Sequence, residues 1–374
     1  MWGIQYLFVA FSSGRLVGMN QIIALRTKEV LKSLDALQLL RDMRVLKKHV
    51  QRLQRRILRK TRSRTTSRKN GRILISRRYL DGELDQIQQS RTLERARYYL
   101  SRLAKALTTE KIAAINDLNL RRWKEYDGVW TDSLWLVPRR DSTSGHSAWY
   151  WGNFVPQIPY QLMLRYTKKG EWVFDPFAGS GTTLLECLRL GRNGLGIELN
   201  PKVANKTISL LRKRTSSSNS VVKVEIEDSA NVNVQKLLKK HGISSVQLAI
   251  LHPPYHDIIR FSNRRHDLSN APSTKAFLQM LGNVVDNSLN VLDKGRYLAL
   301  VIGDKYNKRE WIPLGFLAMN EIMRRNCRLK SIVVKNFDQT SGKRKQEALW
   351  RYRALVGGFY LFKHEYIFVF QKTG

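Results

Sequence analysis

Two short segments of the sequence carry residue types that could hold a cofactor and act on a substrate. The first, Phe174-Asp-Pro-Phe-Ala-Gly-Ser-Gly-Thr-Thr183, follows an apolar run and precedes a helical segment, Leu184 to Leu190. Gly179 and Gly181 allow a tight turn and a close approach of the backbone to a ligand. No Gly-Lys-Ser/Thr follows, so this segment is not a phosphate-binding P-loop.

Carboxylates recur after the next two apolar runs. Gly194-Leu-Gly-Ile-Glu198 ends one run in an acid, and Asp228 follows the next. Carboxylates at such strand ends can accept hydrogen bonds from ribose hydroxyls or from an amino group. Each acid alone is compatible with an ordinary solvated loop, but three of them, with Asp175, at successive strand ends favour a cofactor site.

The second segment, Leu251-His-Pro-Pro-Tyr255, ends a fourth apolar run. Catalytic groups of open α/β sheets gather at the carboxyl ends of strands. Consecutive prolines fix the backbone, so the carbonyl of Pro253 is a rigidly aimed hydrogen-bond acceptor. Tyr255 supplies a flat face on which an unstacked base gains roughly 1–3 kcal/mol.

Positioning these segments requires a sheet with crossover helices. The expected strands are Trp172–Phe174, Gly194–Glu198, Val221–Ile226, Gln247–Leu251 and Tyr297–Ile302, with helix-length segments between them. This alternation predicts an α/β fold with a doubly wound, mostly parallel sheet. Leu329–Val334 and Tyr366–Phe370 break the rhythm and are expected to form an antiparallel terminal pair.

The segment Asp175 to Thr183 resembles the S-adenosylmethionine motif of the N4-cytosine/N6-adenine (amino) DNA methyltransferases, which are class I S-adenosylmethionine-dependent enzymes. The resemblance covers roughly His146 to Lys372. Phe154-Val-Pro156 and the helix expected over Gln157–Tyr166 are similar to the segment that caps the cofactor in this family. Ile302-Gly-Asp304 and His364 to Phe370 resemble its later strands.

The resemblance implies a Rossmann-like class I methyltransferase sheet and S-adenosylmethionine as cofactor. It implies that Asp175 and Gly179 lie against the methionine part, Glu198 against the ribose and Asp228 against the adenine. The candidate cofactor-binding residues are Phe154, Pro156, Asp175, Pro176, Phe177, Gly179, Gly181, Thr182, Glu198 and Asp228. The candidate catalytic residues are His252, Pro253, Pro254 and Tyr255, and no metal site is expected.

Transfer to an exocyclic amino group requires that its nitrogen, whose lone pair is shared with the ring, be turned toward the methyl donor. Two acceptors gripping its N–H bonds would do this, once the base has left the duplex.

The family's tetrapeptide usually begins with Asp, Asn, Ser or Thr, whereas this one begins with His252. A neutral imidazole can accept one hydrogen bond, and a pKa near neutrality would also suit proton removal. Alternatively, His252 is only a structural substitution and the Pro253 carbonyl does most of the gripping. Cytosine N4 is slightly favoured over adenine N6.

Charge indicates the partner. The 374 residues include 66 Lys and Arg against 30 Asp and Glu, a formal charge of +36 that is divided evenly between residues 1–145 and 146–374. A polyanion that touches both parts is expected, and duplex DNA is the natural candidate because no lipidation signal points to a membrane. Only Cys187 and Cys327 are present, which is typical of a reducing compartment such as the cytoplasm.

Residues 1–145 are predicted to be a basic, mainly helical region and residues 146–374 the catalytic domain. Apolar residues from Leu39 to Ile57 follow the spacing of one long helix. Between Arg41 and Arg78, 16 of 38 residues are basic. The helix is either a phosphate-contacting DNA-binding arm or a solvated helix that packs on the core. Thr61 to Gly71 is expected to be a basic linker, and no internal repeat is evident.

Further basic segments flank the expected site. His256 to Lys275, with Arg260, Arg264 and Arg265, resembles the loop that closes over a flipped base, although a plain exposed connection has the same composition. Lys343–Lys345 and Trp350–Arg353 suit contacts with a nucleic-acid backbone. Only about 20 residues separate Asp228 from His252 and little follows Phe370, so sequence recognition is expected to fall to residues 1–140.

Three functions remain open at this stage. The favoured one is a DNA amino-methyltransferase serving restriction–modification or phage defence, with a nuclease or other defence partner. The second is an RNA amino-methyltransferase, because tRNA guanine enzymes use similar motifs but usually carry Gly where this chain has His256. The third is a catalytically inactive, basic nucleic-acid-binding protein.

Overall fold

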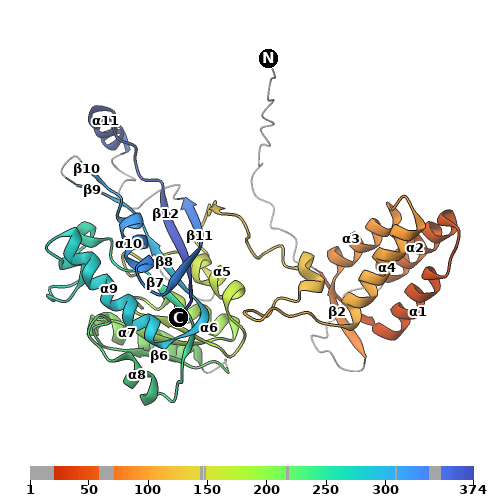
Figure 1. The fold of residues 1–374 in the computed structure, drawn as a ribbon, viewed down its shortest axis with the longest axis horizontal. Coiled ribbons are helices and arrows are strands. Elements are labelled where there is room, and N and C mark those ends of the chain that lie inside the picture. The colour runs from red at the N-terminus through yellow and green to blue at the C-terminus, as the bar shows by residue number, and fades with distance from the viewer. Residues whose placement is uncertain are drawn as a thin grey trace. The chain divides into compact units, whose positions relative to one another are not determined.

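The computed structural model describes residues 21–58, 71–143, 146, 149–215, 219–307, 310–336 and 347–374. The chain divides into two compact units (Figure 1). The N-terminal unit takes in residues up to 112 together with 119–127, and the C-terminal unit takes in residues 113–118 and 128–374. This division falls earlier than the boundary predicted at residue 145, and the strand Leu134–Trp135 already belongs to the sheet of the C-terminal unit.

An eight-stranded sheet organises the C-terminal unit in the order β3-β11-β12-β8-β7-β4-β5-β6. Its strands are β3 (Leu134–Trp135), β4 (Trp172–Asp175), β5 (Asn193–Ile197), β6 (Val222–Glu225), β7 (Val246–Leu251), β8 (Leu292–Ile302), β11 (Cys327–Asn336) and β12 (His364–Lys372). Among these described strands only β12 runs antiparallel to its neighbours. The predicted Rossmann-like sheet with an antiparallel terminal strand is therefore confirmed.

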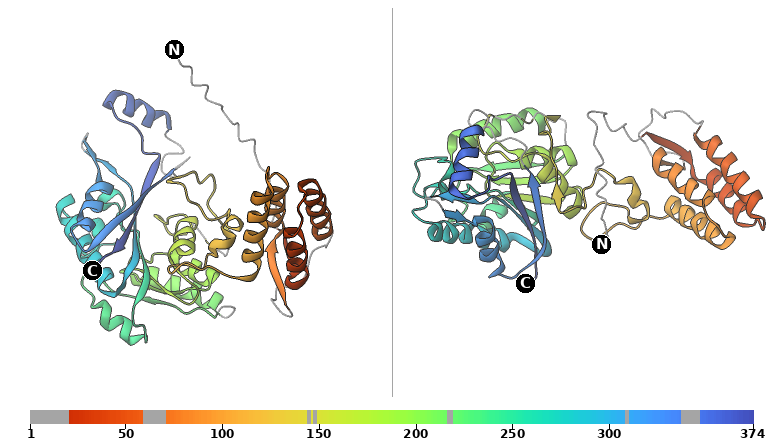
Figure 2. Two further views of the ribbon diagram at one scale, coloured as in Figure 1. Left: turned by 45° about the vertical axis from the view of Figure 1, so that its right-hand side comes forward. Right: turned by 90° about the horizontal axis from the view of Figure 1, so that it is seen from above.

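Helices cover both faces of this sheet (Figures 1 and 2). They are α5 (Gln157–Tyr166), α6 (Thr182–Leu190), α7 (Pro201–Thr215), α8 (Val234–Lys240), α9 (Thr274–Val291) and α10 (Leu314–Met323). Helix α11 (Glu347–Gly357) lies away from the sheet (Figures 1 and 2). Adjacent residues of β4 show how the strands serve two cores: Phe174 packs with side chains of α8, α9 and α10, whereas Val173 packs with side chains of α5. A continuous apolar strand is what burial on both faces demands.

Short elements complete the unit near the ends of the main strands. They are the 3-10 turns η3 (His256–Ile258) and η4 (Leu268–Asn270) and the hairpin strands β9 (Lys305–Asn307) and β10 (Glu310–Ile312). No helix in the described part of the chain is long and apolar enough to cross a membrane.

The N-terminal unit consists of two strand–helix–helix segments. The first comprises β1 (Ile22–Arg26), α1 (Thr27–Gln38) and α2 (Met43–Leu58), and the second β2 (Arg72–Ser76), α3 (Arg77–Gln88) and α4 (Leu93–Thr108), followed by the turn η1 (Leu120–Glu125). The helix predicted over Leu39 to Ile57 is confirmed from Met43 onward, but its start at Leu39 is wrong. Leu39 is 80% exposed in a turn, and Asp42 begins a new helix by accepting hydrogen bonds from the amides of Arg44 and Val45. A side-chain acceptor at this position satisfies N–H groups that have no partner within the helix.

The expectation that the chain has no internal repeat is also wrong. Each element of the second segment begins 50 residues after its counterpart: β2 at Arg72 after β1 at Ile22, and α4 at Leu93 after α2 at Met43. Buried positions correspond in the same way. The corresponding pairs are Leu25 and Ile75, Val30 and Leu80, Leu34 and Leu84, Leu37 and Ile87, Val50 and Leu100, Leu53 and Leu103, and Ile57 and Leu107. Few of these pairs are identical residues, which is why the repeat is hidden in the sequence.

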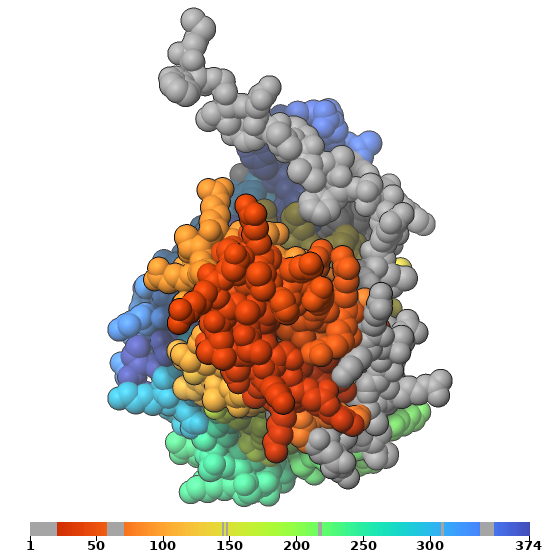
Figure 3. Space-filling view, turned by 90° about the vertical axis from the view of Figure 1, so that its right-hand side faces the viewer, coloured from red at the N-terminus to blue at the C-terminus, as the bar shows by residue number. Residues whose placement is uncertain are grey.

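One apolar core joins the two segments, and the stripe of α2 lies inside it. Leu46, Val50, Leu53 and Ile57 are buried, while Arg52, Arg55 and Arg56 are exposed. Helix α2 therefore packs on the core through its apolar stripe and exposes its arginines, as one of the two interpretations predicted. Contact of these arginines with phosphates stays a prediction. Figure 3 turns the α1–α2 side of the unit toward the viewer. Thr61–Asn70, the bulk of the predicted basic linker, and Arg59 lie outside the described residues.

The repeat predicts matched effects of core truncation. Leu34→Ala and Leu84→Ala each remove a fully buried side chain at equivalent positions, and each should lower the stability of this unit by about 2–5 kcal/mol. Leu39→Ala is the control, because its side chain is exposed and should change stability by less than about 0.5 kcal/mol. Hydrogen exchange of the amides of α1 to α4 in the full chain measures the loss. An equal loss for Leu39→Ala would contradict the break between α1 and α2.

Candidate active site

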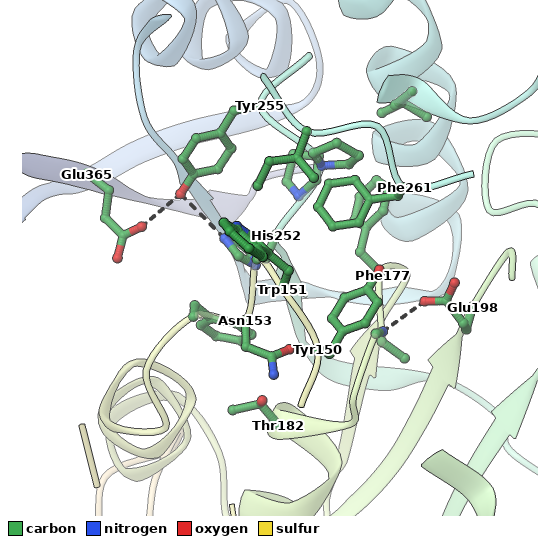
Figure 4. Close-up of a pocket in the computed structure, with 18 of the residues that line it drawn as sticks. Tyr150, Trp151, Asn153, Phe177, Thr182, Glu198, His252, Tyr255, Phe261 and Glu365 are labelled. Carbon is green, nitrogen blue, oxygen red and sulfur yellow. Dashed lines mark hydrogen bonds between the residues drawn. The ribbon is translucent and has the colours of Figure 1, made fainter. Parts of the chain in front are cut away.

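The glycine-containing loop after β4 and the tetrapeptide after β7 line one cavity of about 1050 Å³ (Figure 4). The loop and the tetrapeptide are therefore brought together by the fold. The predicted site residues that line this cavity are Phe154, Pro176, Phe177, Gly179, Thr182, Glu198, Asp228, His252, Pro253, Pro254 and Tyr255. In Figure 4 Glu198 lies on the right of the residues drawn, whereas Tyr255 and Glu365 lie on the left.

Three predicted residues do not line the cavity but shape its wall. Pro156 is the residue before the first turn of α5, and Gly181 occupies the same position before α6 with φ of 78°. Asp175 is 1% exposed at the end of β4, where one carboxylate oxygen accepts the Phe177 amide at 2.9 Å. These residues therefore fix the path of the backbone around the cavity.

Burial makes the charge of Asp175 costly. Desolvation raises the pKa of Asp175 to about 6, although the nearby Thr183 hydroxyl and the hydrogen bond from the Phe177 amide oppose this rise. A buried carboxylate with so few compensating partners is typical of a functional site rather than of a stabilising ion pair.

Glu198 ties the tip of β5 to the glycine loop. Its carboxylate accepts the Gly179 amide at 2.9 Å and the Asn200 amide at 2.8 Å, and burial raises its pKa. Gly179 has φ of 48°, and a Cβ there would meet the ring of Tyr150 at 3.0 Å. Glycine is therefore required at position 179 both for the backbone conformation and for the approach of Tyr150.

Asp228 is placed similarly beyond β6. Its two oxygens accept the Ala230 amide at 2.9 Å and the Asn231 side-chain amide at 2.6 Å. The carboxylate is half-buried at the cavity wall, so its orientation is fixed while one side remains accessible.

His252 lies between two aromatic rings and is neutral at physiological pH. Its ring centroid is 4.7 Å from that of Phe154 and 5.7 Å from that of Tyr255. Burial lowers its pKa to about 4, with opposing contributions from Glu365, which raises it, and Lys335, which lowers it. The expectation of a pKa near neutrality, suited to proton removal, is therefore wrong. The accepting role of a neutral imidazole is compatible with this environment.

A hydrogen-bonded chain leads away from His252 to the last strand. The Tyr255 hydroxyl donates to Glu365 at 2.7 Å and lies 3.4 Å from Nε2 of His252 (Figure 4). Because the hydroxyl proton points at Glu365, the hydroxyl oxygen is the acceptor for a proton on Nε2. This assignment leaves Nδ1 of His252 as the lone-pair nitrogen.

Glu365 forms an ion pair with Lys335 of β11 at 3.2 Å, and both side chains are nearly fully buried. The sequence analysis did not identify either residue. Glu365 and Lys335 lie 110 and 80 residues after Tyr255 in the sequence, and neither belongs to the same sequence motif as Tyr255. Only the pairing of β11 with β12 brings them to the site. The one sequence feature that could have indicated Glu365 is that it is a single acid directly before the last predicted strand.

Further missed residues come from the segment before α5 and from the loop after β7. Tyr150 and Phe261 both line the cavity, and their rings are paired with centroids 5.8 Å apart. Within the described residues, Nδ2 of Asn153 and both Nε and Nη2 of Arg140 are buried without a hydrogen-bond partner. Donors of this kind beside a cavity fit an anionic group such as a carboxylate, because buried polar groups otherwise cost free energy.

The loop after the tetrapeptide is anchored at its first residue. His256 has φ of 54°, a left-handed conformation that is unusual for a residue other than glycine. Its Nε2 lies 2.8 Å from the carbonyl of Ala271 and its Nδ1 lies 2.7 Å from Nζ of Lys305. The two contacts assign a proton to Nε2 and a lone pair to Nδ1, and they hold this strained turn in place.

The same loop contributes part of the cavity wall. Ile258, Ile259, Phe261, His266, Asp267 and Leu268 line the cavity. Arg260, Arg264 and Arg265 do not line it, and their side chains are exposed. The loop therefore presents an apolar and aromatic surface inward and a basic surface outward.

The basic segment between β11 and β12 is described only in part. Trp350 and Arg353 belong to α11, with the guanidinium 5.0 Å from the ring centroid, and Tyr352 is 64% exposed. Lys343–Lys345 lies outside the described residues. No group of metal-binding side chains is present in the portion that the structure describes.

The sheet order and the glycine loop fit the Rossmann-like sheet that the resemblance implied. A family model for N6/N4 DNA methylases matches residues 48–209, from within α2 to α7. The chain is 27% identical over 124 residues to type II methyltransferase M.MthZI of Methanothermobacter thermautotrophicus, covering 32% of this chain and 33% of that protein. It is 35% identical over 115 residues to M.HindIII of Haemophilus influenzae, covering 30% and 35%, and 32% identical over 130 residues to M2.DpnII of Streptococcus pneumoniae, covering 30% and 44%.

These matches support the resemblance to the N4-cytosine/N6-adenine DNA methyltransferases that the glycine motif predicted, over less than half of the chain. The family match also supports S-adenosylmethionine as the methyl donor. The chain spans about a third to under a half of the length of these three relatives. Among solved structures, TrmN from Thermus thermophilus is similar with a TM-score of 0.37 at 16% identity, over 59% of this chain and 50% of that one.

The raised pKa of Asp175 predicts a pH-dependent gain of stability in Asp175→Asn. The unfolded carboxyl loses its proton near pH 4 and the folded one near pH 6, so ionisation destabilises the folded wild type as pH rises through this interval. Without cofactor, Asp175→Asn should be more stable than wild type by up to about 3 kcal/mol above pH 7, and this advantage should shrink toward pH 4. Urea denaturation of both proteins across this range measures the difference. A constant difference would show that Asp175 is not the titrating group.

Proposed function

We propose that this protein transfers a methyl group from S-adenosylmethionine to an exocyclic amino group of a base in duplex DNA. The observation that carries the proposal is the single cavity shared by the glycine loop and the His-Pro-Pro-Tyr tetrapeptide. The match of residues 48–209 to a DNA methylase family model supports DNA as the substrate. The relatives' names as type II methyltransferases support a role in restriction–modification or defence, with a partner nuclease.

The end of the cavity around Glu198 suits the cofactor. When bound, S-adenosylmethionine supplies a methyl group on a positively charged sulfur. The unpartnered donors of Asn153 and Arg140 would bind its carboxylate, Glu198 would accept hydrogen bonds from the ribose, and Asp228 would accept one from the adenine amino group. Phe177 lines the cavity beside Glu198 and would pack on a ring (Figure 4).

The other end suits an amino nitrogen. The Pro253 carbonyl and Nδ1 of His252 would each accept one N–H, so that the nitrogen lone pair turns out of the plane of the base. Since the pKa of His252 is about 4, its lone pair is available throughout the neutral range. His252 thereby replaces the carboxylate, amide or hydroxyl usual in this family without adding charge to the site.

Tyr255 would support the base once it has been flipped out of the duplex. Its hydroxyl is held by Glu365, and a Cβ at Gly303 would approach its ring to 2.9 Å, so the ring has little room to rotate. A ring held in one orientation lowers the entropy lost when a base stacks on it. Extrusion of the base is required because the amino nitrogen cannot reach the donor inside a stacked helix.

Cytosine N4 is proposed ahead of adenine N6 as the target atom, as in the sequence interpretation. Both substrates require the same two acceptors, so the roles assigned to His252 and Pro253 hold for either. A duplex DNA substrate and its methyl donor are found in the cytoplasm, where we expect the protein to act.

Methyl transfer to DNA is the direct prediction. The purified chain with tritiated S-adenosylmethionine should label duplex DNA and leave tRNA unlabelled, because the relatives are DNA enzymes. Single-molecule sequencing of DNA from cells that express the protein should show N4-methylcytosine at a fixed motif. Label on tRNA alone would replace the proposal by an RNA methyltransferase, and label on neither would favour an inactive binding protein.

Tyr255 offers a second test that separates stacking from hydrogen bonding. Tyr255→Ala removes the ring and should lower kcat/KM for DNA by about 5- to 150-fold, which corresponds to the roughly 1–3 kcal/mol of base stacking. Tyr255→Phe keeps the ring and should lose less activity, because only the link to Glu365 is removed. The control is the dissociation constant for S-adenosylmethionine, which should stay within about twofold in both variants. Wild-type turnover in Tyr255→Ala would contradict the stacking role.

A further inference from the structure

The N-terminal unit has the symmetry of a dimer within one chain. Strands β1 and β2 pair antiparallel, with Ala24 opposite Leu74 at the centre and Arg26 opposite Arg72 at one end. The hydrogen bonds that close the two ends are equivalent: the amide of Thr27 donates to the carbonyl of Gly71, and that of Arg77, 50 positions after Thr27, donates to Gln21. A pseudo-twofold axis therefore passes through the middle of this ribbon, and the four helices share one core with it.

The ribbon has two chemically different faces. Alternate side chains Ile23, Leu25 and Ile75 are buried in the core of the unit, and Ile73 packs against them. The opposite face carries Ile22, Ala24 and Arg26 from β1 and Arg72 and Leu74 from β2, of which Ile22 and both arginines are exposed. Ser76 does not contribute to this face, because its side chain caps α3.

Charge identifies the kind of partner that fits the outer face. The ten residues of the two strands include two arginines and no acid, and the described part of this unit has 22 Lys and Arg against 10 Asp and Glu. Arg26 contacts Glu29 at 3.0 Å, but both side chains are at least half exposed, and such surface pairs contribute little. The face is therefore suited to a polyanion that also offers apolar contacts.

Within the described residues, side-chain contacts cover the β2 edge of the ribbon, whereas Ile22, Arg26 and Arg72 on its outer face are exposed. The side chain of Arg122 donates to the carbonyl of Leu74 at 2.8 Å, and Glu125 accepts the amide of Ser76 at 2.8 Å. These contacts satisfy backbone groups of β2 that could otherwise pair with another strand. Contact with a further β-strand at this edge is thereby disfavoured, whereas contact across the outer face remains open.

We propose that the β1–β2 ribbon enters the major groove of duplex DNA and reads the sequence that the catalytic unit methylates. The major groove admits a two-stranded β-ribbon, and known ribbon proteins use this geometry. Arg26 and Arg72 have the chemistry to bind guanine edges, and Ala24 and Leu74 to contact thymine methyl groups. The exposed arginines of α2 then contact phosphates. This inference rests on the proposed function only in taking DNA as the substrate.

The outer faces of the two strands are not equivalent, and this has a consequence for the recognised site. Position 26 is Arg where its repeat counterpart at position 76 is Ser, and position 22 is Ile where its counterpart at position 72 is Arg. A symmetric backbone therefore presents an asymmetric set of side chains. The recognised sequence should be non-palindromic, so that methylation by this chain falls on one strand of each site.

The test compares ribbon and helix arginines in the full chain. Selection of bound molecules from a random duplex library should recover a non-palindromic motif with the wild type, whether or not the DNA is methylated. Arg26→Ala and Arg72→Ala should each weaken binding to that motif by about 5- to 150-fold and relax the preference at one or two base pairs. Arg52→Ala is the matched control on α2. It should weaken binding to all sequences alike and lower by about one the slope of log binding constant against log salt concentration.

The outcomes separate this inference from the proposed function. Motif selection that is unchanged in the Arg26→Ala, Arg72→Ala double variant would overturn the ribbon as reader, and so would a wild type that selects no motif. A wild type that selects a motif, but neither methylates it nor binds S-adenosylmethionine, would overturn the proposed function and leave the ribbon assignment supported. All four arginine variants should retain the wild-type hydrogen-exchange protection of α1 to α4, since their side chains are exposed.

Discussion

The direction of the strands is the constraint on which the whole candidate site depends. β4, β5, β6 and β7 run parallel, so the glycine loop, Glu198, Asp228 and the tetrapeptide all emerge at one edge of the sheet. β11 ends at this edge and the antiparallel β12 begins there, with Lys335 opposite Glu365 in the register. The reversed direction of β12 therefore adds the Lys335–Glu365 ion pair to a site whose other groups follow parallel strands.

The Lys335–Glu365 ion pair and the buried carboxylates of Asp175 and Glu198 differ in how their charges are compensated. Glu365 is compensated by Lys335 and the Tyr255 hydroxyl, so its charge orients a hydrogen-bond chain without leaving an isolated ion. Asp175 has only two donors and a pKa raised to about 6. A protein tolerates such an uncompensated group where a ligand of opposite charge is to be bound, because the ligand then relieves the cost of desolvation.

The sequence was sufficient for the parts of the site that depend on local chemistry. Apolar runs ending in Asp175, Glu198 or His252 predicted the central strands to within one or two residues, and the strand ends placed the motifs correctly. It was insufficient for Glu365, Asn153 and Arg140, whose roles arise from register and from burial rather than from spacing. The pKa of His252 could not be inferred either, because it depends on Phe154 and on the closed cavity around the ring.

The N-terminal repeat shows a different reason why a sequence can conceal structure. Leu46 in the first copy corresponds to Ala96 in the second, so side-chain volume differs at some pairs. The exposed Arg26 corresponds to the buried Ser76, so charge and burial differ at others. What is preserved is the position and length of each strand and helix and of the turns between them, which are properties of the backbone. Once the backbone symmetry is fixed by the shared core, the outward residues are free to diverge. A ribbon with a symmetric frame and asymmetric side chains is therefore well suited to reading one strand sense of DNA, which a symmetric dimer of identical chains cannot do.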